Sequence, residues 1–431
     1  LIDDVDKFLP KTYKFIFDKQ KPSYDQLIKQ ACKVADHLAK LAIKTKNKTT
    51  LIGLEVSPSD YYYISPLKLD LYNGLPGVCL FLAYLGHITK QGSYTDIARS
   101  VLVEINLQLD KKIIDTKLDK KTGFTSLGAF AGLSGIIYTF THLSKLWQDS
   151  SLLDKAVEVA NLIPNLIDKD NSFDIISGTA GCIISLVNLH KYVASEQSQT
   201  VVNIAKQCGE HLISNASSLP QGKAWQNDIG QNPPIGMSHG AAGIAWALLA
   251  LSDLTKENSF ASLAQEALTY ERSFFSAEKA NWPDVNREEQ TESFRITWCY
   301  GATGIGLARL ASLDHLKNDD LIKQEIDVAI NTVLKNGFGS NHSLCHGDLG
   351  NLDFLLCASE KLASASLHNQ VQNIASVILD NIDKHGWLSG MPFSVETPGL
   401  MTGIAGIGYQ LLRLAEPKIV ASITSLENPR I

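Results

Sequence analysis

Seven Gly-x-x-Gly pairs, each followed by an apolar run, recur along this chain of 431 residues. Neighbouring pairs start 46 to 62 residues apart, and their first glycines are Gly74, Gly132, Gly178, Gly240, Gly301, Gly347 and Gly403. At ordinary glycine abundance, chance would give roughly two such pairs, scattered anywhere. Because this spacing leaves room for two helices in each unit, the sequence predicts about seven helical repeats.

The runs that follow the glycine pairs are apolar almost all round, which is typical of buried helices. They are Val78–Leu85, Ile136–Leu143, Ile183–Leu189, Ile244–Leu251, Ile305–Leu313, Leu352–Leu356 and Ile407–Leu414. Segments with one polar face lie between them, for example 95–109, 153–163, 259–273, 320–334 and 368–382, and these indicate amphipathic surface helices. No long β-branched alternation competes with the helical pattern. We therefore expect an all-α fold in which buried and half-exposed helices alternate.

Two topologies fit this alternation, an open superhelical solenoid and a closed α/α toroid with inner and outer rings of helices. An open solenoid needs polar capping repeats at its ends. The first and last units, 71–85 and 401–414, are as apolar as the middle ones. The sequence therefore favours the toroid, in which glycines three residues apart would let the starts of the inner helices crowd toward a common axis. The residues before each glycine pair would then converge on one mouth.

Composition limits the possible partners and the cellular compartment. The net charge of −6 makes the chain a poor binder of nucleic acid, although residues 1–50 hold eleven lysines against six aspartates. Those lysines alternate with apolar residues at helical spacing, so we interpret them as a solvated helical face. No apolar run reaches the roughly 18 to 20 residues that cross a bilayer. We therefore expect no membrane association. The seven cysteines are odd in number and mostly lie in apolar runs, which favours a reducing, cytoplasmic location. We expect residues 1–50 to form an N-terminal helical connecting segment and residues 51–431 to form the toroid domain.

Metal-type ligands stand immediately before the glycine pairs of consecutive units. Cys299 and Cys345 occupy equivalent positions in adjacent repeats, two residues before Gly301 and Gly347, and His346 follows Cys345 directly. Two thiolates and one imidazole suit Zn²⁺, and three protein ligands leave the fourth position open, as in catalytic zinc sites. The alternative is that these cysteines are simply small buried hydrophobic residues.

Three segments resemble the signature motifs of the LanC-like lanthipeptide cyclases. They are Ser238-His239-Gly240-Ala241-Ala242-Gly243, Trp298-Cys299-Tyr300-Gly301-Ala302-Thr303-Gly304 and Cys345-His346-Gly347-Asp348-Leu349-Gly350. The resemblance runs from about Leu51 to Leu414. The stretches 71–77, 80–86 and 398–403 resemble in particular the C-terminal cyclase domain of class II (LanM-type) lanthionine synthetases.

This resemblance implies a carbon–sulfur bond-forming enzyme. It would be a zinc-dependent lanthionine synthetase cyclase that adds a cysteine thiol of a precursor peptide to a dehydroalanine or dehydrobutyrine, giving a thioether ring. His239 matches the family's acid or base, and Asp174 matches a carboxylate that would orient or charge it. Arg295 matches a family arginine that could hold the enolate oxygen or a carboxylate, and Tyr300 matches the family's rim tyrosine. Spacing alone does not separate Asp174 from Asp70, since each stands four residues before a first glycine.

Other functions remain possible from the sequence. A related protein could add glutathione to dehydrated residues, and α/α toroids also host glycosidases and terpene cyclases, which need acidic sites that this mouth does not offer. A non-catalytic peptide-binding scaffold would tolerate any residues at Cys299, Cys345 and His346. The chain carries no Gly-x-x-x-x-Gly-Lys-Ser/Thr phosphate loop. We therefore expect the peptide to arrive already dehydrated by another enzyme or by a dehydratase domain.

Overall fold

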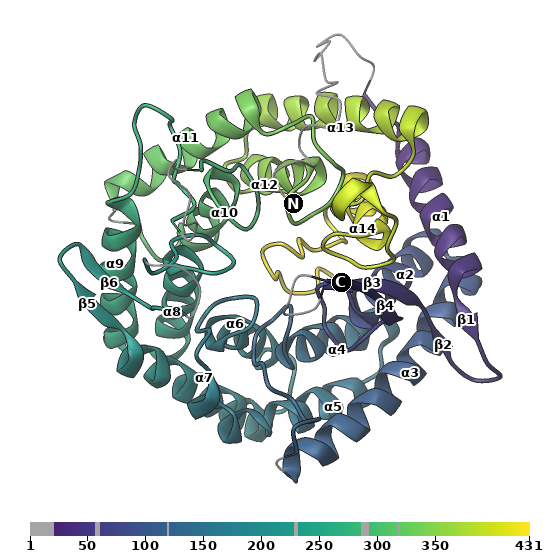
Figure 1. The fold of residues 1–431 in the computed structure, drawn as a ribbon, viewed down its shortest axis with the longest axis horizontal. Helices are drawn as coiled ribbons and strands as arrows, with labels where there is room; N and C mark the ends of the chain where they lie inside the picture. Colours follow the sequence, from purple (N-terminus) through teal and green to yellow (C-terminus); the bar gives the residue numbers. More distant parts are fainter. Residues whose placement is uncertain (1–20, 57–60, 119, 228–231, 286–292, 318) are drawn as a thin grey trace.

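A computed structural model describes residues 21–56, 61–118, 120–227, 232–285, 293–317 and 319–431. Within these residues, fourteen α-helices form two concentric rings (Figure 1). The inner ring consists of α2 (Leu75–Thr89), α4 (Ser134–Trp147), α6 (Thr179–Leu189), α8 (Ala241–Thr255), α10 (Ala302–Ser312), α12 (Asp348–Lys361) and α14 (Ile404–Ala415). The outer ring consists of α1 (Tyr24–Leu41), α3 (Gly92–Lys117), α5 (Ser151–Ala160), α7 (Ser195–Asn215), α9 (Asn258–Arg272), α11 (Asp320–Asn336) and α13 (Ala365–His385).

The inner ring is closed. Each inner helix contacts the next one, and α14 contacts α2, so the ring has no free end. Each inner helix also packs against one outer helix, and six of these pairs are consecutive in the chain. The toroid predicted from the apolar end units is thus confirmed, and every apolar run that we expect to be buried lies in an inner helix, except that Leu313 follows the last residue of α10 and is half-buried.

Helix α1 is the outer partner of α14, the last helix of the chain. Its buried side chains recur at helical spacing and include Leu27, Ala31, Val34 and Leu38, while its lysines face solvent. A capping box at Ser23 starts the helix, because the Ser23 side chain accepts from the backbone of Gln26 and the Gln26 side chain accepts from that of Ser23. The expected solvated lysine face is therefore confirmed for α1, and residues 24–41 also complete the outer ring. The rest of the predicted connecting segment, residues 1–20, lies outside the described residues, and the division near residue 50 stays a prediction.

In the described residues, the helical framework carries three short antiparallel hairpins that the sequence pattern does not predict. They pair β1 (Ile43–Lys44) with β2 (Thr49–Thr50), β3 (Ile52–Val56) with β4 (Tyr62–Pro66), and β5 (Ser217–Leu219) with β6 (Gly222–Ala224). The same part of the chain contains the 3₁₀ turns η2 (Ile163–Asn165), η3 (Ile167–Lys169) and η4 (Pro392–Ser394). Strands of two to five residues are too short to leave a clear alternation in the sequence.

The loops that lead into the inner helices are joined to one another around the ring. In each unit the residue two positions before the first glycine of the pair takes part, and backbone hydrogen bonds of 2.7 to 3.3 Å connect most neighbours. From the fifth loop to the sixth, the donor is the N–H of Trp298, directly before Cys299, and the acceptor is the Cys345 carbonyl. Between the fourth and fifth loops, the Ser238 hydroxyl donates to the Cys299 carbonyl at 3.3 Å. The full circuit is Tyr72, Phe130, Ile176, Ser238, Cys299, Cys345, Met401 and back to Tyr72. We call these seven residues the mouth circuit.

The glycine pairs let these loops fold tightly onto the helices that they start. In all seven units a Cβ added to the second glycine would meet the carbonyl oxygen of the residue six positions earlier. At Gly350 that Cβ would lie 1.9 Å from the Leu344 carbonyl oxygen, a separation that no real Cβ adopts. Glycine therefore makes possible a close approach between each helix and its own loop. The same glycines also lie close to the neighbouring unit, since a Cβ added to Gly77 would lie 2.5 Å from Leu400 Cβ.

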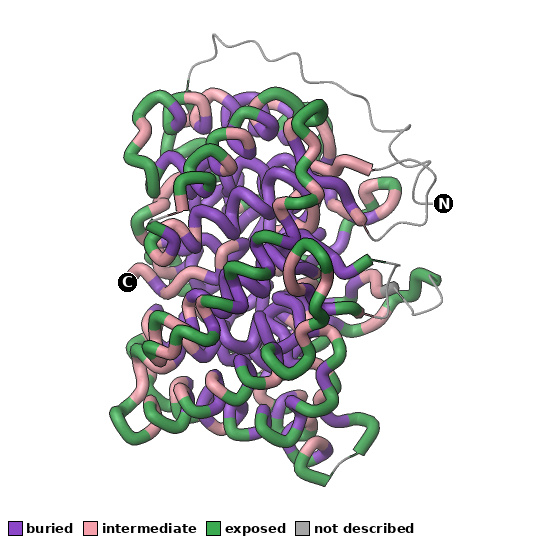
Figure 2. Tube along the Cα trace, turned by 90° about the vertical axis from the view of Figure 1, so that its left-hand side faces the viewer, coloured by how far each residue is buried: buried purple, intermediate pink, exposed green. Residues whose placement is uncertain are grey.

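The C-terminal segment forms part of the interior of the ring. Its backbone carbonyls at Thr424 and Leu426 accept from the side chains of Trp298 and Asn188, at 2.9 and 2.6 Å. The Ser422 and Thr424 hydroxyls donate to the Asp353 carboxylate on α12. Buried positions accordingly fill the middle of the molecule and exposed ones its outside (Figure 2). In the described part of the chain, no helix combines the length and the apolar character that crossing a membrane requires.

Candidate active site and metal centre

Two cysteine sulfurs meet at the mouth circuit. Cys299 Sγ and Cys345 Sγ lie 2.8 Å apart, although 46 residues separate them in the sequence. Their loops are held in register because the Trp298 backbone N–H donates to the Cys345 carbonyl at 3.1 Å. Cys345 is buried and Cys299 is partly exposed. The convergence of equivalent positions in adjacent repeats is what the glycine spacing predicts.

The cysteine pair is electrostatically unusual. Hydrogen bonding to the neighbouring Cys345 sulfur, together with burial, raises the pKa of the Cys299 thiol well above its ordinary value. The positive charges that His239 and His346 can carry act in the opposite direction and lower that pKa. Both histidines therefore lie close enough to Cys299 to influence its ionisation.

His346 is adjacent to the sulfurs but is held by another partner. Its Nε2 lies 2.8 Å from the carbonyl oxygen of Gly390, and a Cβ added to Gly390 would lie 2.9 Å from the same nitrogen. Since a carbonyl oxygen only accepts, Nε2 carries the proton and Nδ1 is the unprotonated nitrogen of the neutral ring. Among the residues that the structure describes, no three His, Cys, Asp or Glu side chains are gathered into a metal-holding group. Two of the three predicted ligands are thus brought together, and the third lies beside them.

The donor set fits zinc in its chemistry. Two sulfurs and one imidazole nitrogen are ligands that Zn²⁺ accepts, and a zinc-bound histidine usually donates its other ring N–H to a carbonyl or carboxylate. The contact between His346 and Gly390 supplies that second interaction and selects the tautomer in which Nδ1 can bind. The metal itself remains a prediction.

His239 forms an ion pair with Asp174 on the same mouth. His239 Nδ1 lies 2.8 Å from Asp174 Oδ2, and the exposed fractions of the two side chains are 30% and 4%. Burial lowers the pKa of His239, but the hydrogen bond and the negative charge of Asp174 outweigh burial and raise it above the ordinary value of 6.5. The imidazole therefore stays protonated to higher pH than a free histidine, and its Nε2 edge is the side left for a substrate.

The structure distinguishes Asp174 from Asp70, which spacing cannot do. Asp70 Oδ1 accepts from the backbone N–H of Asn73 at 2.8 Å, and Asp174 Oδ1 accepts from that of Ser177 at 2.7 Å. Both carboxylates thus close the same kind of turn before a glycine pair. The second oxygen of Asp174 reaches His239. Asp174 is therefore the carboxylate that meets a candidate catalytic side chain.

Arg295 and Tyr300 lie near this ion pair. Arg295 Nε is 3.6 Å from Asp284 Oδ2, and Asp284 contributes to the raised pKa of His239. The Tyr300 ring lies beside the His239 imidazole, with ring centroids 5.9 Å apart. The structure thus places all seven predicted residues on or next to the mouth circuit, while the role of each stays a prediction.

Sequence reasoning missed three participants at the mouth. They are Asp284, the carbonyl of Gly390, and Tyr72, whose hydroxyl donates to the Cys345 sulfur at 2.9 Å. Asp284 lies in an irregular loop outside the repeats, and a backbone carbonyl leaves no trace in the residue type. Tyr72 stands two residues before Gly74, in register with Cys299 and Cys345. That register was the one signal that could have identified it.

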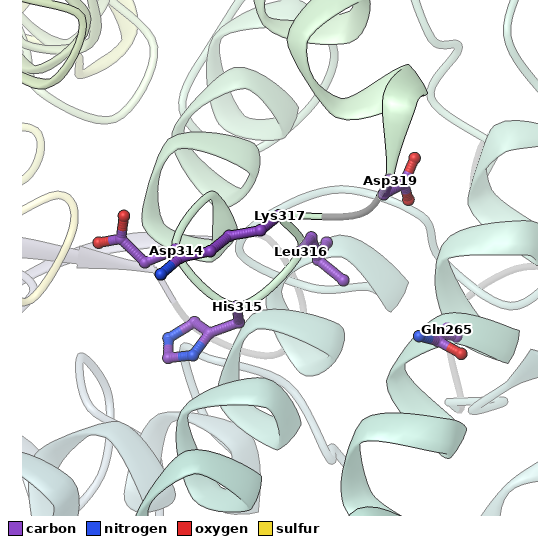
Figure 3. A pocket seen from close by; sticks show the side chains of 6 residues that line it. All are labelled: Gln265, Asp314, His315, Leu316, Lys317 and Asp319. Atoms are coloured by element: carbon purple, nitrogen blue, oxygen red, sulfur yellow. The ribbon is translucent and has the colours of Figure 1, made fainter.

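A cavity of about 390 Å³ elsewhere in the molecule is separate from this site. Its lining side chains come from α9 and from the loop between α10 and α11 (Figure 3), and they are Gln265, Asp314, His315, Leu316, Lys317 and Asp319. Asp314 and His315 there make ion pairs with Lys361 and Asp253. None of the candidate catalytic residues lines this cavity, which belongs to the joint between two repeats.

Comparison with known proteins gives one consistent result. Residues 65–426 match the family described as Lanthionine synthetase C-like protein. The chain is 27% identical over 428 residues to the lacticin 481/lactococcin biosynthesis protein LcnDR2 of Lactococcus lactis subsp. lactis, covering 94% of this chain but only 42% of that protein. It is 21% identical over 381 residues to the nisin biosynthesis protein NisC of the same organism, covering 80% of this chain and 86% of that protein. Among solved structures, nisin cyclase has the same fold, with a TM-score of 0.65 and 18% identity over 93% of this chain and 97% of that one.

Proposed function

The chain belongs to the lanthionine synthetase C-like family, and from this premise we propose that it is a zinc-dependent cyclase that forms thioether rings in dehydrated peptides. The ring would be a lanthionine or methyllanthionine, made by adding a peptide cysteine to dehydroalanine or dehydrobutyrine. The observation that carries the proposal is the meeting, at one mouth, of the Cys299–Cys345 sulfur pair with the Asp174–His239 ion pair. A soft-metal site and a proton-transfer group are the two chemical elements that this addition needs.

Cys299, Cys345 and Nδ1 of His346 would hold the metal. When bound, zinc would favour the thiolate form of the peptide cysteine and keep its sulfur beside the acceptor alkene. The Gly390 carbonyl accepts the Nε2 proton of His346, so in the neutral ring Nδ1 is the nitrogen with a lone pair for the metal. The chain's own contribution to this step is a fixed geometry of two sulfurs and one oriented imidazole.

His239 would move the proton that completes the addition. As the sulfur bonds to the β-carbon, the π electrons of the alkene shift to the α-carbon and its carbonyl oxygen, giving an enolate. His239, kept protonated by Asp174, would donate its proton to the α-carbon. The proton that the thiol loses would pass to solvent, and His239 would take up a proton from solvent before the next addition. The product contains one new carbon–sulfur bond and no leaving group.

Arg295 and Tyr300 would stabilise and shape the reacting end of the peptide. The Arg295 guanidinium forms an ion pair with Asp284 and is a cation next to the mouth circuit. It would hold the enolate oxygen. Tyr300 packs beside the His239 ring and would restrict its orientation. A dehydratase, as a separate enzyme or as part of the same polypeptide, would supply the dehydrated peptide.

The test uses a synthetic peptide that contains one dehydroalanine and one cysteine. With the zinc-loaded chain we expect the alkylatable thiol to disappear faster than without protein, while the peptide mass stays unchanged. A parallel reaction offers glutathione to the same peptide with serine in place of cysteine, because addition there would indicate the glutathione-transferring alternative. Rates equal to the background in both reactions, with zinc bound, would instead indicate a peptide-binding scaffold.

A further inference from the structure

Tyr72 is the only aromatic hydroxyl that the structure, within its described residues, places on a sulfur of the candidate metal centre. Its hydroxyl donates to Cys345 Sγ at 2.9 Å, across 273 positions of sequence. Tyr72 belongs to the first repeat and Cys345 to the sixth, so the contact exists only because the ring closes. Nothing in the fold of either repeat alone would bring these two groups together.

The backbone of Tyr72 is fixed on both sides. Its N–H donates to the Phe130 carbonyl at 3.0 Å, and its own carbonyl accepts from Met401 at 2.7 Å. Both contacts are part of the mouth circuit. The phenol therefore extends from a locked position, and little side-chain freedom has to be lost for it to reach the sulfur.

The sulfurs of Cys299 and Cys345 differ in the groups that contact them. Among the described residues, the hydrogen-bonding contacts of the Cys299 sulfur are both with Cys345. They are with its sulfur, at 2.8 Å, and with its carbonyl oxygen, at 4.0 Å. Cys345 has the Tyr72 hydroxyl in addition. A hydrogen bond donated to a thiolate withdraws electron density from sulfur, which orients its lone pairs and makes it a weaker nucleophile.

We propose that Tyr72 is a positioning residue that donates a hydrogen bond to the Cys345 thiolate, holding this sulfur as a metal ligand and reducing its reactivity toward electrophiles. The inference rests on the proposed function, since it assumes that Cys345 binds the metal. Its consequence is selectivity. Because a dehydrated peptide is an electrophile, the site must let the peptide's own thiol react while protecting the sulfurs of the protein.

The experiment compares wild type, Tyr72→Phe and a control, Tyr84→Phe. The first substitution removes one hydroxyl and keeps the ring. The control removes a buried hydroxyl from Tyr84 on α2, which belongs to the same repeat as Tyr72. The Tyr84 hydroxyl contacts His142 Nδ1 on α4 at 2.7 Å, and no sulfur of the candidate metal centre. Melting curves of all three proteins show whether each variant folds.

Three measurements that do not depend on turnover follow. With cobalt in place of zinc, the thiolate-to-cobalt charge-transfer band of Tyr72→Phe should move to lower energy, because the sulfur lone pairs are no longer stabilised. Competition with a chelator should show about tenfold weaker zinc binding, the usual effect of losing a second-layer partner of a metal ligand. Limited alkylation with iodoacetamide, followed by peptide mapping, should label Cys345 several-fold faster while Cys299 changes little.

A second variant guards against indirect effects of the Phe substitution. Replacing Tyr72 by 3-fluorotyrosine keeps the hydroxyl and makes it a stronger donor, so the cobalt band should shift to higher energy. Opposite shifts in the two variants are the expected result, with the control equal to wild type.

The outcomes separate this inference from the proposal on which it rests. A wild type that takes up neither cobalt nor zinc would overturn the metal centre and this inference together. A wild type that binds metal, with a Tyr72→Phe variant that matches it in band position, zinc affinity and Cys345 labelling, would overturn the role of Tyr72 and leave the proposed function standing.

Discussion

Two pairs of cysteines lie close together in this molecule, and their surroundings differ. Cys299 and Cys345 stand on loops, each two residues before a glycine pair, with sulfurs 2.8 Å apart. Cys182 and Cys208 stand inside α6 and α7, fully buried, with sulfurs 3.8 Å apart. Both pairs join residues that are distant in the sequence. Proximity of two thiols is therefore not what distinguishes a candidate metal centre here.

The groups around each pair make the difference. The hydrogen bond to Cys345 and burial raise the pKa of Cys299, while the charges of two histidines oppose that rise, and a tyrosine hydroxyl donates to the Cys345 sulfur. The pKa of Cys208 is raised by its hydrogen bond to Cys182 and by burial, and the nearby carboxylate of Asp170 raises it further. In both pairs the neighbouring sulfur and burial raise the thiol pKa, but the nearby charges act in opposite directions, against that rise at the mouth and with it between the two helices. Position in the glycine register separates a chemical role from a packing role.

The largest expected effect comes from removing one cysteine of the Cys299–Cys345 pair. Cys345→Ala removes a predicted zinc ligand, so we expect less than one zinc per chain and no cyclisation above background. Cys208→Ala, the matched substitution in the buried pair, should keep both zinc and activity. Elemental analysis and the thiol-loss assay measure these outcomes. Full zinc occupancy in Cys345→Ala would show that the two pairs do not differ in the way proposed.

The second prediction separates metal binding from proton transfer within the mouth. His239→Ala should keep its zinc, because His239 is paired with Asp174 and not with the sulfurs. Its cyclisation rate should fall about a hundredfold or more, the usual loss when a general acid or base is removed. Zinc content and rate are measured on the same preparation. If zinc were lost together with activity, His239 would have to be reassigned as a ligand.

Much of the fold was predictable because the glycine pairs mark the start of every inner helix. The partners of those helices were harder to predict. The packing of α1 on α14 could not be predicted from local sequence, since 362 residues lie between the two helices and the apolar face of either could have packed elsewhere. The short hairpins were missed for the opposite reason, because two to five residues carry too little pattern.

Some residues of the candidate site were predictable from the sequence and others were not. Cys299 and Cys345 were predictable because they share one register position, and that register also contains Tyr72. An aromatic residue there does not reveal its partner, since the sequence does not show which residues of the closed ring face each other. Asp174 was matched by resemblance, but only the second carboxylate oxygen, directed at His239, distinguishes it from Asp70.

The third prediction concerns pH and the ion pair. The pKa of His239 is raised in the folded protein, so the ion pair stabilises the fold fully below about pH 6.5, the ordinary histidine value. This stabilisation is lost as pH rises through the raised folded value. A rate that needs protonated His239 should fall over the same range.

Asp174→Asn keeps the size of the side chain and removes its charge. The alkaline fall in rate should then move to lower pH, and the rate at neutral pH should drop about tenfold, as expected for losing a charge-assisted hydrogen bond of roughly 1.5 kcal/mol. Asp70→Asn is the control, because Asp70 closes the equivalent turn without contacting a histidine. An unchanged pH profile in Asp174→Asn would separate the carboxylate from the chemistry.

The smallest expected effect lies in the buried pair. Cys182→Ala removes one sulfur atom from the packed contact between α6 and α7, where its neighbour Cys208 is also fully buried. The lost contacts and the small space left behind should reduce the free energy of unfolding by about 1 kcal/mol. Zinc content and cyclisation should stay at the wild-type level, since among the contacts described the Cys182 sulfur touches Cys208 and no residue of the mouth circuit. Denaturant melts and the thiol-loss assay test the two statements separately. A loss of activity in Cys182→Ala that exceeded its loss of stability would mean that the packing between α6 and α7 shapes the mouth, because Asp174 enters the site from the loop that starts α6.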